Sequence, residues 1–212
     1  MRTPSRRAQR GFTLIEILVV IAIIGLLMSI LVVSLGRQAE AGRIADCRAR
    51  LEQIKLLLES YANRVGDYPP SHLAPLGVKE NNRVNEGVEA LVVALKSSSY
   101  TGRRPEEIWL ANTDGDKDDA LKLADGSHAL LELVDPWDNP IVYIANGDYR
   151  DEFVYRFGSG PTSEDFTLRA ATNPLTQAPQ QFDSFQLLSA GPDGLPGSDD
   201  DIANYEIPTQ DD

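Results

Sequence analysis

The chain has 212 residues, a net charge of −12 at neutral pH and a hydrophobic content of 42%. Four of its 20 basic side chains are arginines within the first eleven residues, where there is no acid. The remainder therefore carries 16 basic against 32 acidic side chains, a net charge of −16. Such an acidic surface argues against nucleic-acid binding, which needs basic groups to neutralise phosphates.

Cysteine and histidine usage excludes two further classes of site. The single cysteine, Cys47, rules out an intrachain disulfide and is interpreted as a small buried apolar residue. The two histidines, His72 and His128, have no His or Cys neighbour, which argues against a zinc site. The sequence also shows no nucleophile–base pair and no glycine-rich phosphate loop, so we expect no enzymatic activity.

An apolar run of 24 residues, 12–35, dominates the N-terminal part, and its only charge is Glu16. As a helix this run is about 36 Å long, enough to cross a bilayer. A carboxylate inside hydrocarbon costs about 3 kcal/mol on insertion scales, so Glu16 needs a specific reason to be there. The run predicts a transmembrane helix, with the preceding arginines keeping the N-terminus on the cytoplasmic side.

Two simpler interpretations of this segment explain less. A cleaved secretory signal has a shorter apolar core, although Ala39-Glu40-Ala41 resembles a cleavage site. A plain signal anchor accounts for the length and the arginines but not for Glu16 or for the Gly11-Phe12 junction.

The segment Arg10-Gly11-Phe12-Thr13-Leu14-Ile15-Glu16 resembles the leader junction of type IV pilins and type II secretion pseudopilins. In that family a prepilin peptidase cuts after the glycine and methylates the new N-terminus. The resemblance implies a leader peptide over 1–11, cleavage after Gly11 and N-methylation of Phe12. It also implies that Glu16 pairs with the N-terminal ammonium of a neighbouring subunit, which makes a buried charge specific for assembly.

The helix is expected to continue beyond the membrane as an amphipathic half over 36–66. Apolar side chains recur there at steps of three or four: Ile44, Cys47, Leu51, Ile54, Leu58, Tyr61 and Val65. Gly66 and the prolines at 69 and 70 end the helix, because proline cannot continue it. Residues 67–212 then form a periplasmic globular domain.

For this domain we predict an α+β, pilin-like fold in which the long helix packs on a small antiparallel β-sheet. We expect short helical pieces over 85–95, opened by Asn85, and over 104–111. Strands are expected over 141–143, 152–157 and 185–189. Residues 158–182 are poor in apolar side chains and are interpreted as a long surface loop, either a contact surface or a flexible insertion.

A turn rich in Pro, Asp and Asn, residues 135–140, leads into the first of these strands. With the strand it resembles the Asp-Pro-Trp-Gly-x-Pro-Tyr motif of the major pseudopilin, which implies that Trp137 packs in the core. Asp138 stands where glycine is usual and Ile141 where tyrosine is usual. The first departure concerns the backbone of the turn.

Residues 112–119 are acidic, with Asp114, Asp116 and Asp118 at alternate positions. With Asp125 at the twelfth position the run resembles a calcium loop, but Asp119 stands where an EF-hand has glycine. Both a second ion site and a solvated turn are compatible with this sequence.

The C-terminal stretch 189–201 combines glycines and prolines with four aspartates. Turns that bring these carboxylates together create repulsion that a hard cation with oxygen ligands, such as calcium, relieves. Major pseudopilins end in a similar loop that binds calcium. The resemblance places ligands at Asp193, Asp200 and Asp201 and at the Ala190 carbonyl. Asp199 shifts the register by one if it is a ligand, and a solvated acidic tail is the alternative.

The leading hypothesis is a structural subunit that forms a homo-oligomeric helical filament, the periplasmic pseudopilus of a bacterial type II secretion system. The expected partners are the prepilin peptidase, other pseudopilins and the inner-membrane assembly platform. A type IV pilin for adhesion, motility or DNA uptake is one alternative, and a membrane-anchored calcium-dependent binding module is the other. Glu16 argues against the plain anchor, and against the tip subunit that lacks this glutamate in the family.

Overall fold

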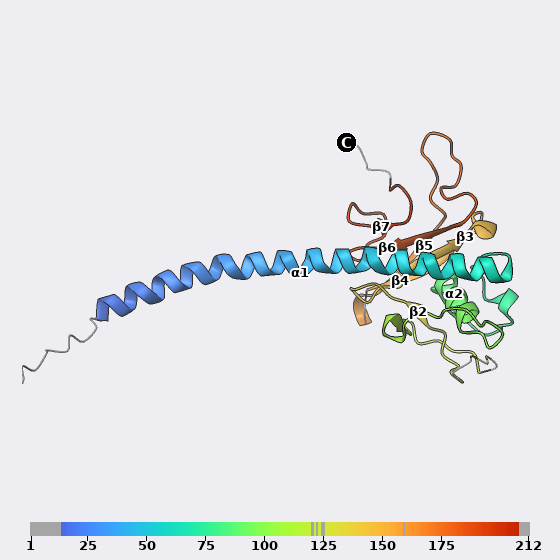
Figure 1. The fold of residues 1–212 in the computed structure, drawn as a ribbon, viewed down its shortest axis with the longest axis horizontal. Coiled ribbons are helices and arrows are strands. Elements are labelled where there is room, and N and C mark those ends of the chain that lie inside the picture. The colour runs from blue at the N-terminus through green and yellow to red at the C-terminus, as the bar shows by residue number, and fades with distance from the viewer. Residues whose placement is uncertain (1–13, 120, 122, 124–125, 159, 208–212) are drawn as a thin grey trace, which may run out of the picture. The chain divides into compact units, whose positions relative to one another are not determined.

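The computed structural model describes residues 14–119, 121, 123, 126–158 and 160–207. They form one long helix, one short helix and seven strands. The helices are α1 (Leu14–Val65) and α2 (Glu86–Lys96). The strands are β1 (Leu110–Ala111), β2 (Glu132–Leu133), β3 (Val142–Ala145), β4 (Phe153–Phe157), β5 (Glu164–Leu168), β6 (Phe185–Ser189) and β7 (Ile202–Ala203) (Figure 1).

The chain divides into two compact units, residues 1–42 and 43–212, and the division lies inside α1. In the first unit α1 exposes apolar side chains from Leu14 to Met28. Within the described residues, no helix combines the length and the apolar character needed to cross a membrane. Most of the leader junction, including Gly11 and Phe12, lies outside the described residues.

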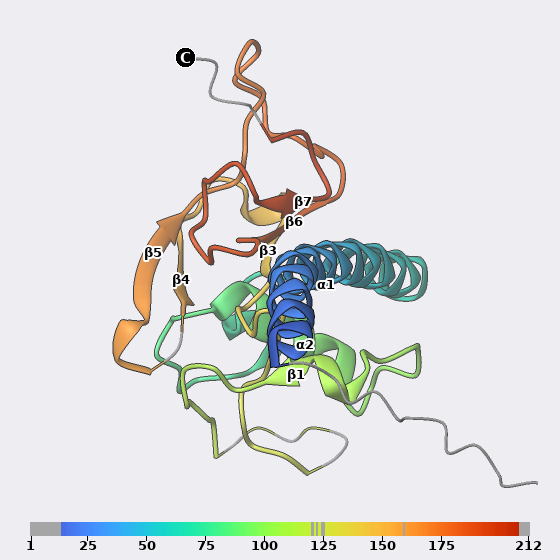
Figure 2. The same ribbon diagram turned by 90° about the vertical axis from the view of Figure 1, so that its left-hand side faces the viewer.

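In the second unit three small antiparallel sheets surround α2 and the end of α1. The strand orders are β1-β2, β3-β6-β7 and β4-β5 (Figure 2). The core joins one face of α1 to the inner sides of β3, β4 and β6, and the α1 residues Cys47, Leu51, Ile54 and Leu58 are buried in it. The expected helix-on-sheet, α+β arrangement is confirmed, with the sheet divided into three.

Helix α2 is buried along almost its entire length. Every residue after Glu86 is buried, and the helix contacts β2, β3 and β4. Val88 and Leu91 on one side join the main core, whereas Ala90 and Val93 belong to a second cluster with Leu130. Helix α2 therefore lies between the two hydrophobic clusters and contributes side chains to both.

Two expectations for the domain were wrong in part. The piece over 104–111 is only a 3₁₀ turn, Glu107–Trp109, because Leu110 leaves it to pair with Leu133 as β1. The supposed loop 158–182 contains β5, which pairs with β4. Strand β5 is mostly exposed, and Phe166 packs edge-on against Phe157 at 5.8 Å between ring centroids, so a low apolar content still permits an edge strand.

Candidate functional site

The acidic C-terminal loop, residues 190–201, is the connection between β6 and β7. The two strands pair antiparallel, with Ser189 opposite Ile202 at the mouth of the loop. This pairing fixes both ends of the loop, so its aspartates are held within one hairpin. Ala190, the expected carbonyl ligand, is fully buried where the loop begins.

Hydrogen bonds link two of the four aspartates, Asp193 and Asp200, and hold the third, Asp201, within the loop. The backbone amide of Asp193 donates to Oδ2 of Asp200 over 3.1 Å, and the amide of Gly197 donates to Oδ2 of Asp201 over 2.7 Å. The hydroxyl of Ser198 lies between the carboxylates of Asp193 and Asp200 and donates to them. The loop thus links Asp193 to Asp200, and both lie close enough to Asp201 for their charges to act on it.

The carboxylate of Asp201 is only partly hydrogen-bonded. Its Oδ1 atom is buried and has no hydrogen-bond partner among the described residues. Burial, with the nearby charges of Asp200 and Asp193, raises the pKa of this carboxyl group to about 6. A set of oxygen donors with one orphaned buried oxygen fits a hard cation.

Two observations show that the four aspartates of the loop do not form a closely spaced set of cation ligands. Asp199 is exposed and forms no hydrogen bond among the described residues, so it stands apart from the other three aspartates. The carboxylate oxygens of the loop also do not reach the mutual spacing of 4.8 Å that other acidic groups in the described chain reach. The hydroxyl of Ser198 occupies the space between two of them.

Gly191 allows the two arms of the loop to touch. Its φ is +63°, and a Cβ atom there would lie 2.2 Å from the backbone carbonyl oxygen of Asp200. Any side chain at this position would push Asp200 away from Asp193. The close approach of the carboxylates therefore depends on a glycine.

The turn 135–140 supports this loop from below. The buried carboxylate of Asp135 accepts hydrogen bonds from the amides of Trp137 and Asn139 and from the hydroxyl of Ser189, the last over 2.7 Å. The same hydroxyl accepts a hydrogen bond from the amide of Gly191. One side chain of the turn thus fixes the start of the acidic loop.

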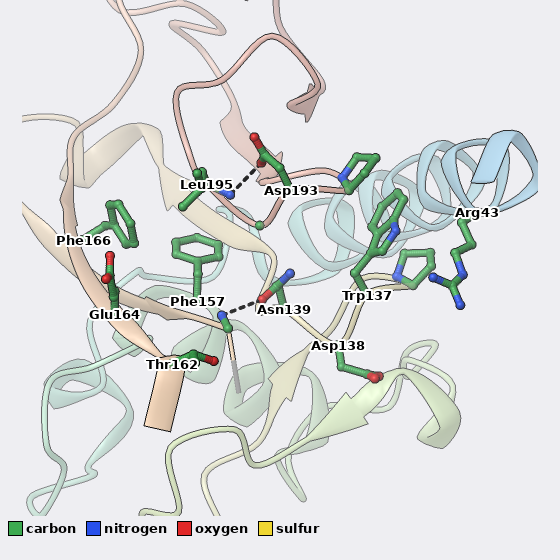
Figure 3. Close-up of a pocket in the computed structure, with 14 residues that line it drawn as sticks. Arg43, Trp137, Asp138, Asn139, Phe157, Thr162, Glu164, Phe166, Asp193 and Leu195 are labelled. Carbon is green, nitrogen blue, oxygen red and sulfur yellow. Dashed lines mark hydrogen bonds between the residues drawn. The ribbon is translucent and has the colours of Figure 1, made fainter. Parts of the chain in front are cut away.

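A cavity of about 600 Å³ lies between the turn, the acidic loop and strands β4 and β5 (Figure 3). The rings of Trp137, Phe157 and Phe166 line it together with Asp193 and Leu195. Trp137 is half-buried and packs against the main core, as expected, and it also faces this cavity.

Comparisons with known proteins find one family model and several curated relatives. Residues 6–32 match the family model described as the prokaryotic N-terminal methylation motif. The type II secretion system core protein G of Pseudomonas aeruginosa is 29% identical over 154 residues, which cover 73% of this chain and 86% of that protein. The proteins of the same name from Escherichia coli K12 and Klebsiella pneumoniae are each 25% identical over 199 residues, 94% of this chain and 92% and 96% of theirs.

Over most of its length the chain is therefore similar to core protein G of type II secretion systems, and its N-terminal part matches the methylation motif. The shared name of these relatives describes a component of a secretion system. No solved structure matches the chain significantly. Its glutamate of the methylation motif, Glu16, lies in the first turn of α1 and is exposed. An acidic side chain there also interacts favourably with the positive end of the helix dipole.

The acidic run 112–119 does not form an EF-hand. Asp118 instead accepts a hydrogen bond from the backbone amide of Lys79 over 2.9 Å. Asp125 lies outside the described residues. Asp114 and Asp116 do approach other acids, but these are Glu89 and Glu132 from distant parts of the chain.

Sequence reasoning missed three contributors to these acidic sites. Ser198 was not predicted because only carboxylates and one backbone carbonyl, that of Ala190, were considered as loop ligands. Glu89 and Glu132 were missed because each has apolar neighbours in the sequence and no cluster of acids around it. A charged residue on the buried side of a helix or strand was the signal that could have identified them.

Proposed function

We propose that the chain is a subunit of the periplasmic pseudopilus of a type II secretion system, held in the inner membrane as a single-pass protein before assembly. Its N-terminus faces the cytoplasm and residues 67–212 face the periplasm. The observation that carries the proposal is a methylation motif at the start of a helix whose later part is built into an α+β domain.

Assembly runs through the N-terminal helix. Cleavage after Gly11 leaves Phe12 as the new, methylated N-terminus, and its ammonium group pairs with Glu16 of the next copy. A charge pair that forms only between subunits offsets the cost of placing a carboxylate in an apolar environment. The exposed apolar side chains between Leu14 and Met28 then pack between copies.

Mass spectrometry of the N-terminus, on protein from native membranes, tests the processing step. The expected mature chain begins at N-methylated Phe12. A chain that retains Met1, or one that begins at Gly42, would contradict the proposal.

Assembly is tested with Glu16→Gln, which keeps the size of the side chain and removes its charge. We expect a chain that is still cleaved and methylated but whose filaments, measured by cross-linking and sedimentation, fall by at least about tenfold. Glu52→Gln is the matched control, because Glu52 is an exposed glutamate of the same helix. Equal assembly of the two variants would exclude the role of Glu16.

We also propose that the loop 190–201 binds calcium through Asp193, Asp200 and Asp201 with the carbonyl of Ala190. The orphaned Oδ1 of Asp201 supports this, because a buried carboxylate oxygen needs a proton, a donor or a cation. Calcium accepts six to eight oxygen ligands in irregular geometry, which suits a loop of this kind. An ion bound only by the folded chain stabilises the β6–β7 hairpin in a protein without a disulfide.

The register of the loop is tested by a matched pair of variants. Asp193→Asn removes a bound calcium ion and lowers the gain in melting temperature that calcium produces. Asp199→Asn, which has the same change of charge in the same loop, keeps both. Calcium titrations of the chelator-treated protein make the measurement, and a wild-type response in Asp193→Asn would refute the site.

A further inference from the structure

A second group of carboxylates meets inside the domain, far from the C-terminal loop. It consists of Glu89 on α2, Glu132 on β2 and Asp114 in the loop after β1, and one oxygen of each lies within 4.8 Å of the others. Asp116 lies beside Glu89 and interacts with its carboxyl group. The structure therefore places acids from three segments at one point.

Glu89 points into this group from the buried helix. Its exposed fraction is 0%, and among the described residues no amide, hydroxyl or cationic group donates a hydrogen bond to its carboxylate oxygens. The carboxyl group of Asp116 is close enough to share a proton with it. The Oδ1 atom of Asp116 is buried in the same way. Among the described residues, no lysine or arginine forms an ion pair with any of these acids. An uncompensated buried carboxylate is costly, and this group contains one, Glu89, together with one buried, unpartnered oxygen of Asp116.

The neighbouring acids are held in place by neutral donors. Glu132 accepts hydrogen bonds from the side-chain amide of Asn85 over 3.1 Å and from the backbone amide of Thr113 over 3.0 Å. Asp114 accepts one from the side-chain amide of Asn82 over 2.9 Å. Such outer donors orient a carboxylate while leaving its charge in place, as they do around metal ligands.

Asn85 is itself fixed for this role. Its φ is +58°, in the left-handed region, and its side-chain oxygen accepts a hydrogen bond from the backbone amide of Arg156 on β4. It occupies the N-cap position of α2 without capping the helix with its side chain. The side-chain amide is instead spent on Glu132 and Thr113.

Two states relieve the repulsion among these acids. In one, Glu89 takes up a proton, because burial and the charges of Asp116, Asp114 and Glu132 raise the pKa of its carboxyl group to about 11. In the other, a cation binds between the carboxylates. Protonation of Glu89 alone satisfies at most one acceptor, since a carboxylic acid has a single proton to donate.

We propose that Glu89, Asp114, Asp116 and Glu132 bind a calcium ion between α2, β2 and the loop 112–119. All four ligands are carboxylates, and the described group contains no histidine or cysteine, which disfavours zinc. Four acids from three separate segments give the irregular, oxygen-rich shell that calcium accepts more readily than magnesium. The site ties the acidic loop to the buried helix.

The inference is tested by counting calcium ions on the full-length chain in detergent. The chain is stripped with a chelator, dialysed and titrated calorimetrically with calcium alone. We expect two ions on the wild type, one on Glu89→Gln and one on Asp193→Asn, and none on the double variant. Asp119→Asn is the matched control, because Asp119 is an exposed acid of the same loop, and it should keep both ions.

Melting temperatures measured in chelator and in calcium give a second test. They distinguish calcium binding by Glu89 from a purely structural role of this residue. In chelator, Glu89→Gln should melt at or above the wild-type temperature, since an amide replaces a buried acid, yet gain less from calcium. Asp114→Asn, a change at a partly exposed position, should lose the same ion.

The possible outcomes separate this site from the C-terminal loop. A wild type that binds only the ion removed by Asp193→Asn, or a Glu89→Gln variant that binds as many ions as the wild type, would overturn the inference. A single ion lost in Glu89→Gln but kept in Asp193→Asn would support it and contradict the loop site instead.

Discussion

Asp138 is one of the exposed, non-glycine residues whose backbone lies in the left-handed region. Its φ is +64°, in the left-handed region, within the turn that supports the acidic loop. Aspartate tolerates this conformation better than most residues, but glycine adopts it without steric cost. The sequence pattern had already marked this position, because related turns carry glycine there.

We expect Asp138→Gly to stabilise the domain by about 0.5–1 kcal/mol, because relief of backbone strain exceeds the added flexibility of the unfolded chain. Asp138→Ala should destabilise it, since alanine has neither the freedom of glycine nor the local hydrogen bonding of aspartate. Urea unfolding of the three proteins makes the comparison. A lower stability of the glycine variant would show that the aspartate side chain itself holds the turn.

His72 connects the segment after α1 to two acids. Its Nδ1 lies 3.3 Å from Glu86 and its Nε2 lies 3.1 Å from Asp151. Burial lowers the pKa of the ring, but hydrogen bonds to Asp151 and Glu86 outweigh this and raise the pKa above its ordinary value of 6.5. The contribution of His72 to stability is therefore complete below about pH 6.5 and is lost as the pH rises through the folded-state pKa.

Unfolding measurements at pH 6 and pH 8 test this assignment. The wild type should lose stability over this interval, and His72→Gln should lose clearly less. His128→Gln is the matched control, because the ring of His128 is exposed, and it should follow the wild type. A His72→Gln variant with the full wild-type pH dependence would assign the effect to other groups.

Among the elements, α2 packs most closely against its neighbours, and Gly87 makes this possible. A Cβ atom at Gly87 would lie 2.3 Å from the carbonyl oxygen of Tyr143 and 2.4 Å from the hydroxyl of Tyr155. These groups are already joined, because the Tyr155 hydroxyl accepts from the amide of Tyr143 and donates to its carbonyl. A methyl group at Gly87 would force α2 away from β3.

Gly87→Ala should therefore destabilise the domain by about 1–3 kcal/mol, although alanine favours helices more than glycine does. Gly147→Ala serves as control, because Gly147 is exposed and no heavy atom stands within 4 Å of the added Cβ. Thermal unfolding of both variants makes the test. Equal melting temperatures would mean that α2 shifts without cost.

At the same scale, the sequence predicted elements that carry their own periodicity. The helix 85–95 and the strands over 152–157 and 185–189 are present within a residue or two, because their apolar patterns match one buried face. Strand β5 was not predicted, because it is an exposed edge strand that depends on pairing with β4. The acids Glu89 and Glu132 were missed for the same reason, since only the tertiary fold brings them to Asp114.

For the whole molecule, both hydrophobic clusters belong to the second unit. Their buried members all come from residues beyond Ile44, and residues 1–42 form a separate compact unit. We expect residues 43–212 alone to fold cooperatively, with a melting temperature close to that of the full chain under equal calcium. Calorimetry of both chains makes the measurement. A fragment that melts without a cooperative transition would show that the first part of α1 stabilises the domain.

The burial of α2 also governs how the domain opens. Its amides lie between two clusters and three strands, so no partial separation of the sheets can bring water to them. Hydrogen exchange at α2 should therefore require global unfolding, whereas the exposed strand β5 exchanges through local opening. Strand β5 at the edge can therefore open locally without unfolding the domain. The hydrogen-exchange rates of the α2 amides, in contrast, measure the free energy of global unfolding.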